Sequence, residues 1–260
     1  MIKEIALHEL RNIVQSRKFA LTFAVVSSLI ILSVLLGIRN YHSQMKAYNT
    51  MVQLNEQEMR ERRDWMSMSS KTMRKPDVMS VFVNGVNYDL GRYSVISSFQ
   101  PVNLVHSVYT DEPFFAVFRF LDFSFIVTIV LSLFILVFTY DAVNGEAASG
   151  TLKLIFSNPV PRASFLLGKF AGVWLAIIIP LLIPLLLSIM LLVILGVPLT
   201  AADYISVLAL FGLTVLLCTF FMVLGIALSA LIKQPSVSFL TALVTWVILT
   251  FIVPRGGIIA

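Results

Sequence analysis

The chain has 260 residues, of which 58% are hydrophobic and 13% are charged, and its net charge is +5. Soluble domains usually carry about 25% charged residues, so this composition excludes an ordinary soluble protein. Several uncharged runs reach the roughly 20 residues that a spanning helix needs, which predicts an all-α polytopic membrane protein. The modest positive charge indicates membrane orientation rather than a nucleic-acid partner. The single cysteine, Cys218, excludes a disulfide framework.

The first 18 residues predict an amphipathic helix that precedes the first apolar run. Apolar residues between Ile2 and Val14 fall at helical spacing, and Glu9 is the one carboxylate among them. Because Arg17 and Lys18 mark the junction with the membrane, this helix should lie in the interface. It is either a simple anchor or an elbow helix that also contacts a cytoplasmic partner.

Five apolar runs predict five membrane spans in the lipid bilayer. The predicted spans are residues 19–38, 114–140, 170–195, 204–232 and 236–253. Pro180 and Pro184 interrupt the third span and predict a kink. Gly212, Gly225, Ala227 and Ser229 in the fourth span allow close packing against neighbouring helices.

A long polar segment, residues 39–113, separates the first two spans and predicts a mixed helix and hairpin insertion. Its first part keeps a heptad-like apolar spacing, so the first span should continue outward as a helix until Lys75-Pro76. Residues 78–83 and 86–90 are β-rich and flank an Asn84-Gly85 turn, which predicts a β-hairpin.

Arg119 and Asp122 lie near the outer end of the second predicted span, three residues apart, so they can pair on one helix face. Charges in a span are candidates for function, and this pair is either structural or part of a substrate pathway. No His or Cys accompanies them, so they lack the partners that acid–base or nucleophilic chemistry needs. We therefore expect no catalytic residue and no metal site.

The charge of the short loops predicts the orientation of the chain. One side would hold Lys3, Arg11, Arg17, Lys18, Lys153, Arg162, Lys169 and Lys233, whereas the other would hold only Arg255. Because positive residues concentrate in cytoplasmic loops, the N-terminus and residues 141–169 should be cytoplasmic. Residues 39–113 should then be extracellular.

Residues 141–169, hereafter the loop, form the only sizeable polar segment in the second half of the sequence. A helix can start at Ala147 and should be interrupted at Gly150. Residues 151–157 then predict a short amphipathic helix, which Asn158-Pro159 should end. A short helix bracketed by turns can transmit rigid-body motion into the spans on either side of it.

The loop also resembles the corresponding loop of type-2 ABC transporter permeases. The shared motif comprises Asp141, Glu146, Gly150-Thr151-Leu152, Pro159, Arg162 and Gly168-Lys169. The amphipathic start and the order of spans extend the resemblance over nearly the whole chain. Residues 81–85 (VFVNG) and the long segment around them look like the subset of these permeases with large extracellular insertions.

The resemblance implies that the loop is a coupling helix that docks into a groove of a separate ATPase subunit. Two permease copies, identical or different, and two ATPase copies would form a transporter in the plasma membrane, usually an exporter. Leu152, Leu154, Ile155 and Phe156 would form the docking surface or else rest on the lipid interface. Glu146 and Asp141 would pair with basic groups of the groove or with Arg162 and Lys169, which otherwise mark the membrane boundary.

The chain contains no GxxxxGK[ST] phosphate-binding motif, because Ala163 and Phe170 occupy two of the positions it requires around Gly168-Lys169. ATP and Mg²⁺ should therefore bind to the partner, and the permease should be neither an enzyme nor bound to a cofactor.

Three further expectations remain from the sequence. The family has six membrane spans, whereas this sequence predicts five. Either the chain is truncated before its last span, or the third apolar run hides a re-entrant piece. A non-transporting membrane anchor or mechanotransmission subunit that uses the same ATPase is the main alternative function. A membrane-embedded enzyme is a further alternative.

Overall fold

The computed structural model describes residues 2–61, 69–83, 93–97, 104–105, 122–157 and 159–254. Among them, five helices are long and apolar enough to cross a membrane, which confirms the predicted polytopic helical fold. The chain divides into two compact units. Unit 1 comprises residues 1–29, 125–187 and 208–260, and unit 2 comprises residues 30–124 and 188–207.

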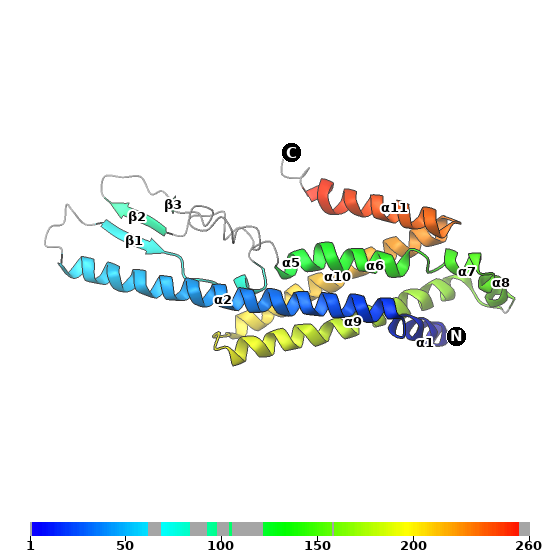
Figure 1. Ribbon diagram of the computed structural model, residues 1–260, viewed down its shortest axis with the longest axis horizontal. Coiled ribbons are helices and arrows are strands. Elements are labelled where there is room, and N and C mark those ends of the chain that lie inside the picture. Colours follow the sequence, from blue (N-terminus) through cyan, green and yellow to red (C-terminus); the bar gives the residue numbers. More distant parts are fainter. Residues whose placement is uncertain are drawn as a thin grey trace. The chain divides into compact units, whose positions relative to one another are not determined.

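The helices follow the apolar runs of the sequence (Figure 1). The first half contains α1 (Ile2–Val14), α2 (Arg17–Glu61), α5 (Phe123–Phe125), the π-helical segment η4 (Ile126–Leu131) and α6 (Ser132–Thr139). The second half contains α7 (Asn144–Ala148), α8 (Thr151–Phe156), α9 (Arg162–Ile194), α10 (Ala201–Leu231), α11 (Pro235–Val247) and the π-helical segment η5 (Ile248–Ile252). Pro180 and Pro184 both lie inside the single helix α9. The predicted start of the second span at residue 114 lies outside the described residues.

Polar side chains join the spans of unit 1 to one another. The Trp246 indole N–H of α11 donates to Ser132 Oγ of α6 over 2.8 Å, and the Trp174 indole N–H of α9 donates to Thr219 Oγ1 of α10 over 3.1 Å. Hydrogen bonds between spans are favourable because lipid offers no alternative partner. These bonds therefore fix which helix faces meet inside the unit.

The two glycines predicted to favour close packing differ in their surroundings. A Cβ built on Gly225 would lie 2.8 Å from Thr139 Cβ, so this glycine permits the close approach of α10 and α6. A Cβ on Gly212 would have no atom within 4 Å. The prediction is confirmed for Gly225, whereas for Gly212, which meets no neighbour among the described residues of this chain, it stays a prediction.

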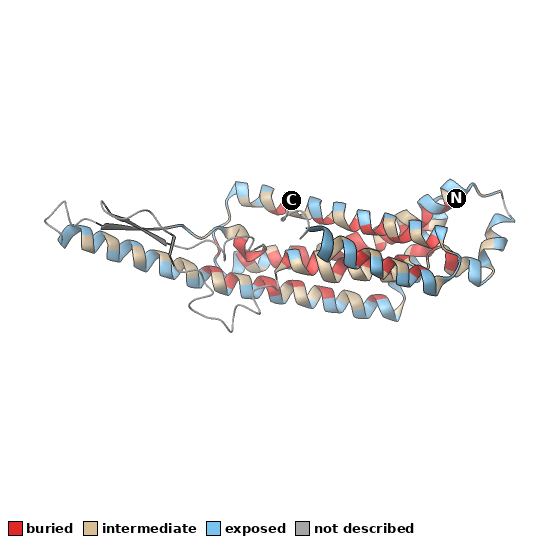
Figure 2. Ribbon diagram, turned by 90° about the horizontal axis from the view of Figure 1, so that it is seen from above, coloured by how far each residue is buried: buried red, intermediate tan, exposed pale blue. Residues whose placement is uncertain are grey.

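The long helices carry buried residues along one side and exposed apolar residues along the other (Figure 2). In α9 and α10, for example, Leu186, Leu213 and Leu216 are 61%, 65% and 68% exposed, while Ala176 and Met222 are fully buried. An exposed apolar face of this extent is unfavourable in water and is satisfied by lipid.

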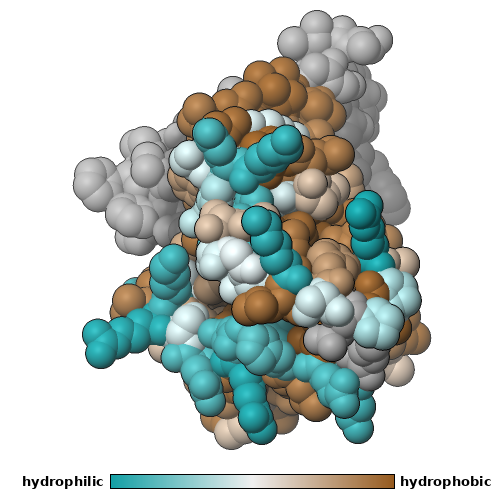
Figure 3. Space-filling view, turned by 90° about the vertical axis from the view of Figure 1, so that its right-hand side faces the viewer, coloured by the Kyte–Doolittle hydropathy of each residue, from teal (hydrophilic) through white to brown (hydrophobic). Residues whose placement is uncertain are grey.

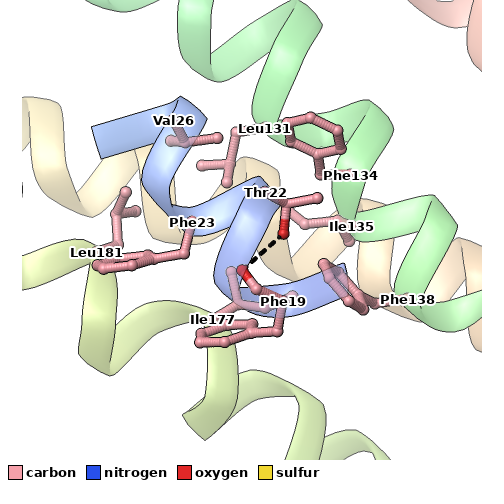
Figure 4. Close-up of a pocket in the computed structure, with 10 residues that line it drawn as sticks. All are labelled: Phe19, Thr22, Phe23, Val26, Leu131, Phe134, Ile135, Phe138, Ile177 and Leu181. Atoms are coloured by element: carbon pink, nitrogen blue, oxygen red, sulfur yellow. Dashed lines mark hydrogen bonds between the residues drawn. The ribbon is translucent and has the colours of Figure 1, made fainter. Parts of the chain in front are cut away.

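An apolar cavity of about 30 Å³ lies in unit 1 among α2, η4, α6 and α9 (Figure 4). It is lined by Phe19, Thr22, Phe23, Val26, Leu131, Phe134, Ile135, Phe138, Ile177 and Leu181. The Thr22 hydroxyl donates to the Phe19 and Lys18 carbonyls of its own helix, so it offers no free polar group. A cavity this small and apolar is a packing defect rather than a substrate site.

Unit 2 contains the outer part of α2, a small sheet and a short 3₁₀ helix. Strand β1 (Ser69–Met73) pairs antiparallel with β2 (Tyr93–Ser97), with Ser69 opposite Ser97, and β2 pairs antiparallel with β3 (Leu104–Val105). The outward continuation of α2 as a helix is confirmed as far as Glu61. Its predicted extension to Lys75 is wrong, because residues 69–73 pair with a strand distant in sequence, which local spacing cannot reveal.

The predicted hairpin strand at residues 78–83 is also wrong, since Val78–Val81 forms the 3₁₀ helix η2. The Asp77 carboxylate accepts the Met79 backbone N–H over 3.1 Å and thereby caps this helix. Val81 and Phe82 are 2% and 0% exposed, and the Phe82 ring meets Phe123 edge-on at 6.3 Å. Capping and burial therefore override β-propensity here, while the predicted turn and strand at 84–90 lie outside the described residues.

Candidate functional site

The loop consists of two short helices and the first turns of α9, joined by turns. α7 begins at Asn144 and α8 ends at Phe156, and α9 starts at Arg162. Gly150 separates α7 from α8 with a φ of +79°, a left-handed conformation that side chains other than glycine rarely adopt. This break agrees with the helix interruption predicted from the sequence. It separates an anchored half, residues 141–149, from an exposed half, residues 150–162; the rest of the loop, residues 163–169, belongs to the first turns of α9.

The anchored half is bonded to the end of α10. The backbone N–H groups of Val143 and Asn144 both donate to Ser229 Oγ, over 3.0 and 3.2 Å. The Asn144 side-chain amide donates to the Ile232 carbonyl over 3.1 Å. Asn144 and Ser229 are 2% and 1% exposed, so these bonds are shielded from water. α7 is therefore fixed to the spans rather than free on the surface.

A buried ion-pair cluster ties the two ends of the loop to each other and to α1. Lys169 Nζ lies 2.6 Å from Glu9 Oε2 of α1 and 2.5 Å from Glu146 Oε1 of α7. Lys169 itself is in the second turn of α9 and is 4% exposed. These three residues, the Lys169 cluster, tie α1, α7 and α9 to a single ammonium group. Because buried charges need partners, removing any one of them should be costly.

Two glycines of α9 allow α1 to approach closely enough for this contact. A Cβ on Gly168 would lie 2.8 Å from Ile5 Cβ, and a Cβ on Gly172 would lie 2.6 Å from Glu9 Cβ. Both distances are shorter than real Cβ contacts. The face of α1 that carries Glu9 therefore packs on protein, which explains why a carboxylate stands among its apolar residues.

The Lys169 cluster contains two carboxylates and one ammonium. Asp141 lies within electrostatic range of Lys169 and of Lys18, so a third carboxylate adds to the negative charge of this region. Within the part of the chain that the structure describes, Glu146 Oε2 is buried and has no hydrogen-bond partner. Of the loop's carboxylates, Glu146 is engaged by Lys169 through Oε1, while Asp141 is half-buried.

The exposed half presents both apolar and cationic side chains. Leu154 is 71% exposed, and Lys153, Pro159 and Arg162 are also exposed. Phe156 is 37% exposed and its ring meets that of buried Phe165 at 5.6 Å, which holds α8 against α9. α8 therefore presents an exposed leucine at the surface while an aromatic contact holds it against α9.

A sequence model of ABC-2 family transporter proteins matches residues 4–259. The chain belongs to this family. No curated protein matches it in a sequence comparison. Membership makes the chain a multi-pass membrane permease component of an ABC transporter, and permeases of this family generally work with an ATPase subunit.

The structure brings together part of the set of residues predicted for this permease. Of the two local partners suggested for Glu146, Lys169 makes the ion pair, and Arg162 is exposed. Thr151 is exposed, whereas Leu152 and Ile155 are half-buried in α8. Arg119 lies outside the described residues, so its pairing with Asp122 stays a prediction.

Sequence reasoning did not assign a role to Glu9 or Asn144, and it gave Ser229 only a role in close helix packing. Glu9 was visible as the single acid on the apolar face of α1, and that exception was the signal for a buried ion pair. Asn144 and Ser229 are 85 positions apart, and no local pattern connects them.

Proposed function

We propose that this permease is the membrane subunit of an exporter driven by a separate ATPase, which docks on α8. The observation that carries the proposal is the contrast inside the loop. α8 offers an exposed apolar side chain, Leu154, while the adjoining α7 is bonded to Ser229 and Lys169. A surface that receives a partner is thus continuous with residues that are fixed to the spans.

The Lys169 cluster supports a path for movement from α8 to the spans. A displacement of α8 reaches α9 through the Phe156–Phe165 contact and through the short connection from Pro159 to Arg162. The displacement passes from α8 to the adjoining α7. From there it reaches α10 through the hydrogen bonds of Val143 and Asn144 to Ser229. Packed, hydrogen-bonded elements move as units rather than deform, so ATP-driven motion of the partner would tilt these helices.

The proposal includes an orientation and an assembly. The N-terminus and the loop would face the cytoplasm at the plasma membrane, because among the short loops they hold most of the Lys and Arg residues, and the opposite side would hold only Arg255. A second permease copy, identical or different, would complete the translocation path. ATP and Mg²⁺ would be bound by the ATPase, since the chain lacks the phosphate-binding motif.

A co-purification experiment with matched variants tests this proposal. The wild-type permease should retain an ATPase and change its hydrolysis rate. Leu154→Ser should reduce that change severalfold without altering thermal stability. Leu231→Ser is the control, because Leu231 is 80% exposed but lies at the end of α10, outside the loop. Equal effects of the two substitutions, or none of either, would contradict docking on α8.

A mechanotransmission subunit is the second candidate. It is favoured by α2, an uninterrupted helix of 45 residues that continues well beyond the length of one membrane crossing. At 1.5 Å per residue, such a helix is about 68 Å long, roughly twice the thickness of the hydrocarbon core. Reconstituted vesicles distinguish the two functions, because a mechanotransmission subunit would stimulate the ATPase with no movement of substrate.

A further inference from the structure

The charged side chains on the exposed half of the loop are all positive. Residues 147–167 contain no Asp or Glu, and their only charged residues are Lys153 and Arg162. Both side chains are exposed. Among the residues that the structure describes, neither forms an ion pair. Two cations therefore lie near the exposed Leu154, and no ion pair with a described residue compensates their charge.

The carboxylates of Glu9 and Glu146 are less accessible to a partner than these two cations. Glu9 and Glu146 both pair with Lys169, and their side chains are 10% and 21% exposed. A partner with basic groups would have to break this buried cluster to reach them. Breaking a buried pair is costly, so a groove of basic residues fits this loop poorly.

Figure 3 shows the end of unit 1 that carries α1, α7 and α8, coloured by hydropathy. Hydrophilic side chains project around patches of apolar surface. Exposed Lys153 and Arg162 stand on either side of the α8–α9 connection, and Leu154 follows Lys153 directly. An apolar centre with charged surroundings is typical of a protein–protein interface.

We propose that the partner ATPase receives α8 in a groove with an apolar floor and an acidic rim. The floor contacts Leu154, and carboxylates of the rim pair with Lys153 and Arg162. This inference rests on the proposed function and adds the chemistry of the docking surface. Charges at a rim mainly guide association and set its salt dependence, while the apolar centre supplies affinity.

Anionic lipid head groups are the competing partner for Lys153 and Arg162, since cations beside a membrane attract acidic lipids. The exposed Leu154 and the docking function favour the ATPase. The two partners respond differently to membrane composition. A protein–protein ion pair persists in nanodiscs of zwitterionic lipid, whereas a head-group contact disappears there.

The test measures the affinity of the co-purifying ATPase for permease in nanodiscs, with and without anionic lipid, at low and high salt. Lys153→Glu/Arg162→Glu should weaken binding about tenfold at low salt, because attraction is replaced by repulsion at two rim positions. The loss should shrink at high salt. Lys46→Glu/Lys233→Glu is the control, with the same charge change at two exposed positions outside the loop and α1, and should change affinity less than twofold.

Two results would overturn the inference while leaving the proposed function intact. One is unchanged affinity for the loop double variant while Leu154→Ser still weakens coupling. The other is a loss of affinity that occurs only in nanodiscs containing anionic lipid, which would assign the two cations to head groups. Failure of the unsubstituted permease to bind or affect any ATPase would instead contradict the proposed function.

Discussion

The two halves of the loop differ in almost every physical respect, although they are adjacent in sequence. The anchored half, residues 141–149, places Asn144 at 2% exposure and Glu146 in a buried ion pair. The exposed half, residues 150–162, has Leu154 at 71% exposure and two exposed cations. Stability should therefore depend on the first half and partner binding on the second. Substitutions can separate these two roles.

Lys169→Met should have the largest effect on stability. It leaves Glu9 and Glu146 without their cation, and removing one partner of a buried ion pair costs about 3–5 kcal/mol. Thermal unfolding in detergent measures the loss. The triple variant Glu9→Gln/Glu146→Gln/Lys169→Met removes the unpaired charges and should recover part of it. No recovery would show that the charges are not what stabilises the cluster.

Gly172→Ala should have the next largest effect. Its Cβ would lie 2.6 Å from Glu9 Cβ and 2.7 Å from the Ala6 carbonyl oxygen, so α1 must shift away from α9. Overpacking of this kind costs about 1–3 kcal/mol. Gly212→Ala is the control, because nothing lies within 4 Å of its Cβ, and helix propensity predicts a gain of up to about 1 kcal/mol. Melting curves that shift equally for both variants would contradict the packing of α1 on α9.

Gly150→Ala should have a smaller effect, because it acts on the junction between the halves. The φ of +79° disfavours alanine by about 1 kcal/mol, and nothing within 4 Å would clash with its Cβ. Gly150→Asn should cost less, since asparagine tolerates left-handed backbone better. Thermal unfolding of the two variants compares them. Identical losses would mean that the conformation of Gly150 does not limit this junction.

Periodic features of the structure were predictable from sequence, and features that depend on distant partners were not. The five spans follow from uncharged apolar runs, and the break at Gly150 follows from local helix signals. η2 replaced the predicted strand because Phe82 packs against Phe123, a contact between residues far apart in the chain. At the site, Glu146 and Lys169 were identified by a family motif, but their pairing with Glu9 required the position of α1 on α9.

Glu9 illustrates how a local exception can carry information about tertiary structure. A carboxylate on an apolar helix face is unfavourable unless it finds a cation. A carboxylate at this position is therefore a signal for a cationic partner, although sequence reasoning assigned Glu9 no role. The signal could not indicate which of the basic residues served, because Lys169 is 160 positions away.

The most direct test of the central claim is photo-crosslinking of the assembled transporter from position 154. A photoreactive residue at Leu154 should form a covalent adduct with the ATPase, because α8 lies in its groove. The same residue at Leu231, which is even more exposed but outside the loop, should give none. Absence of an adduct from position 154, in a complex whose ATPase is still stimulated, would contradict the assignment of α8 as the docking helix.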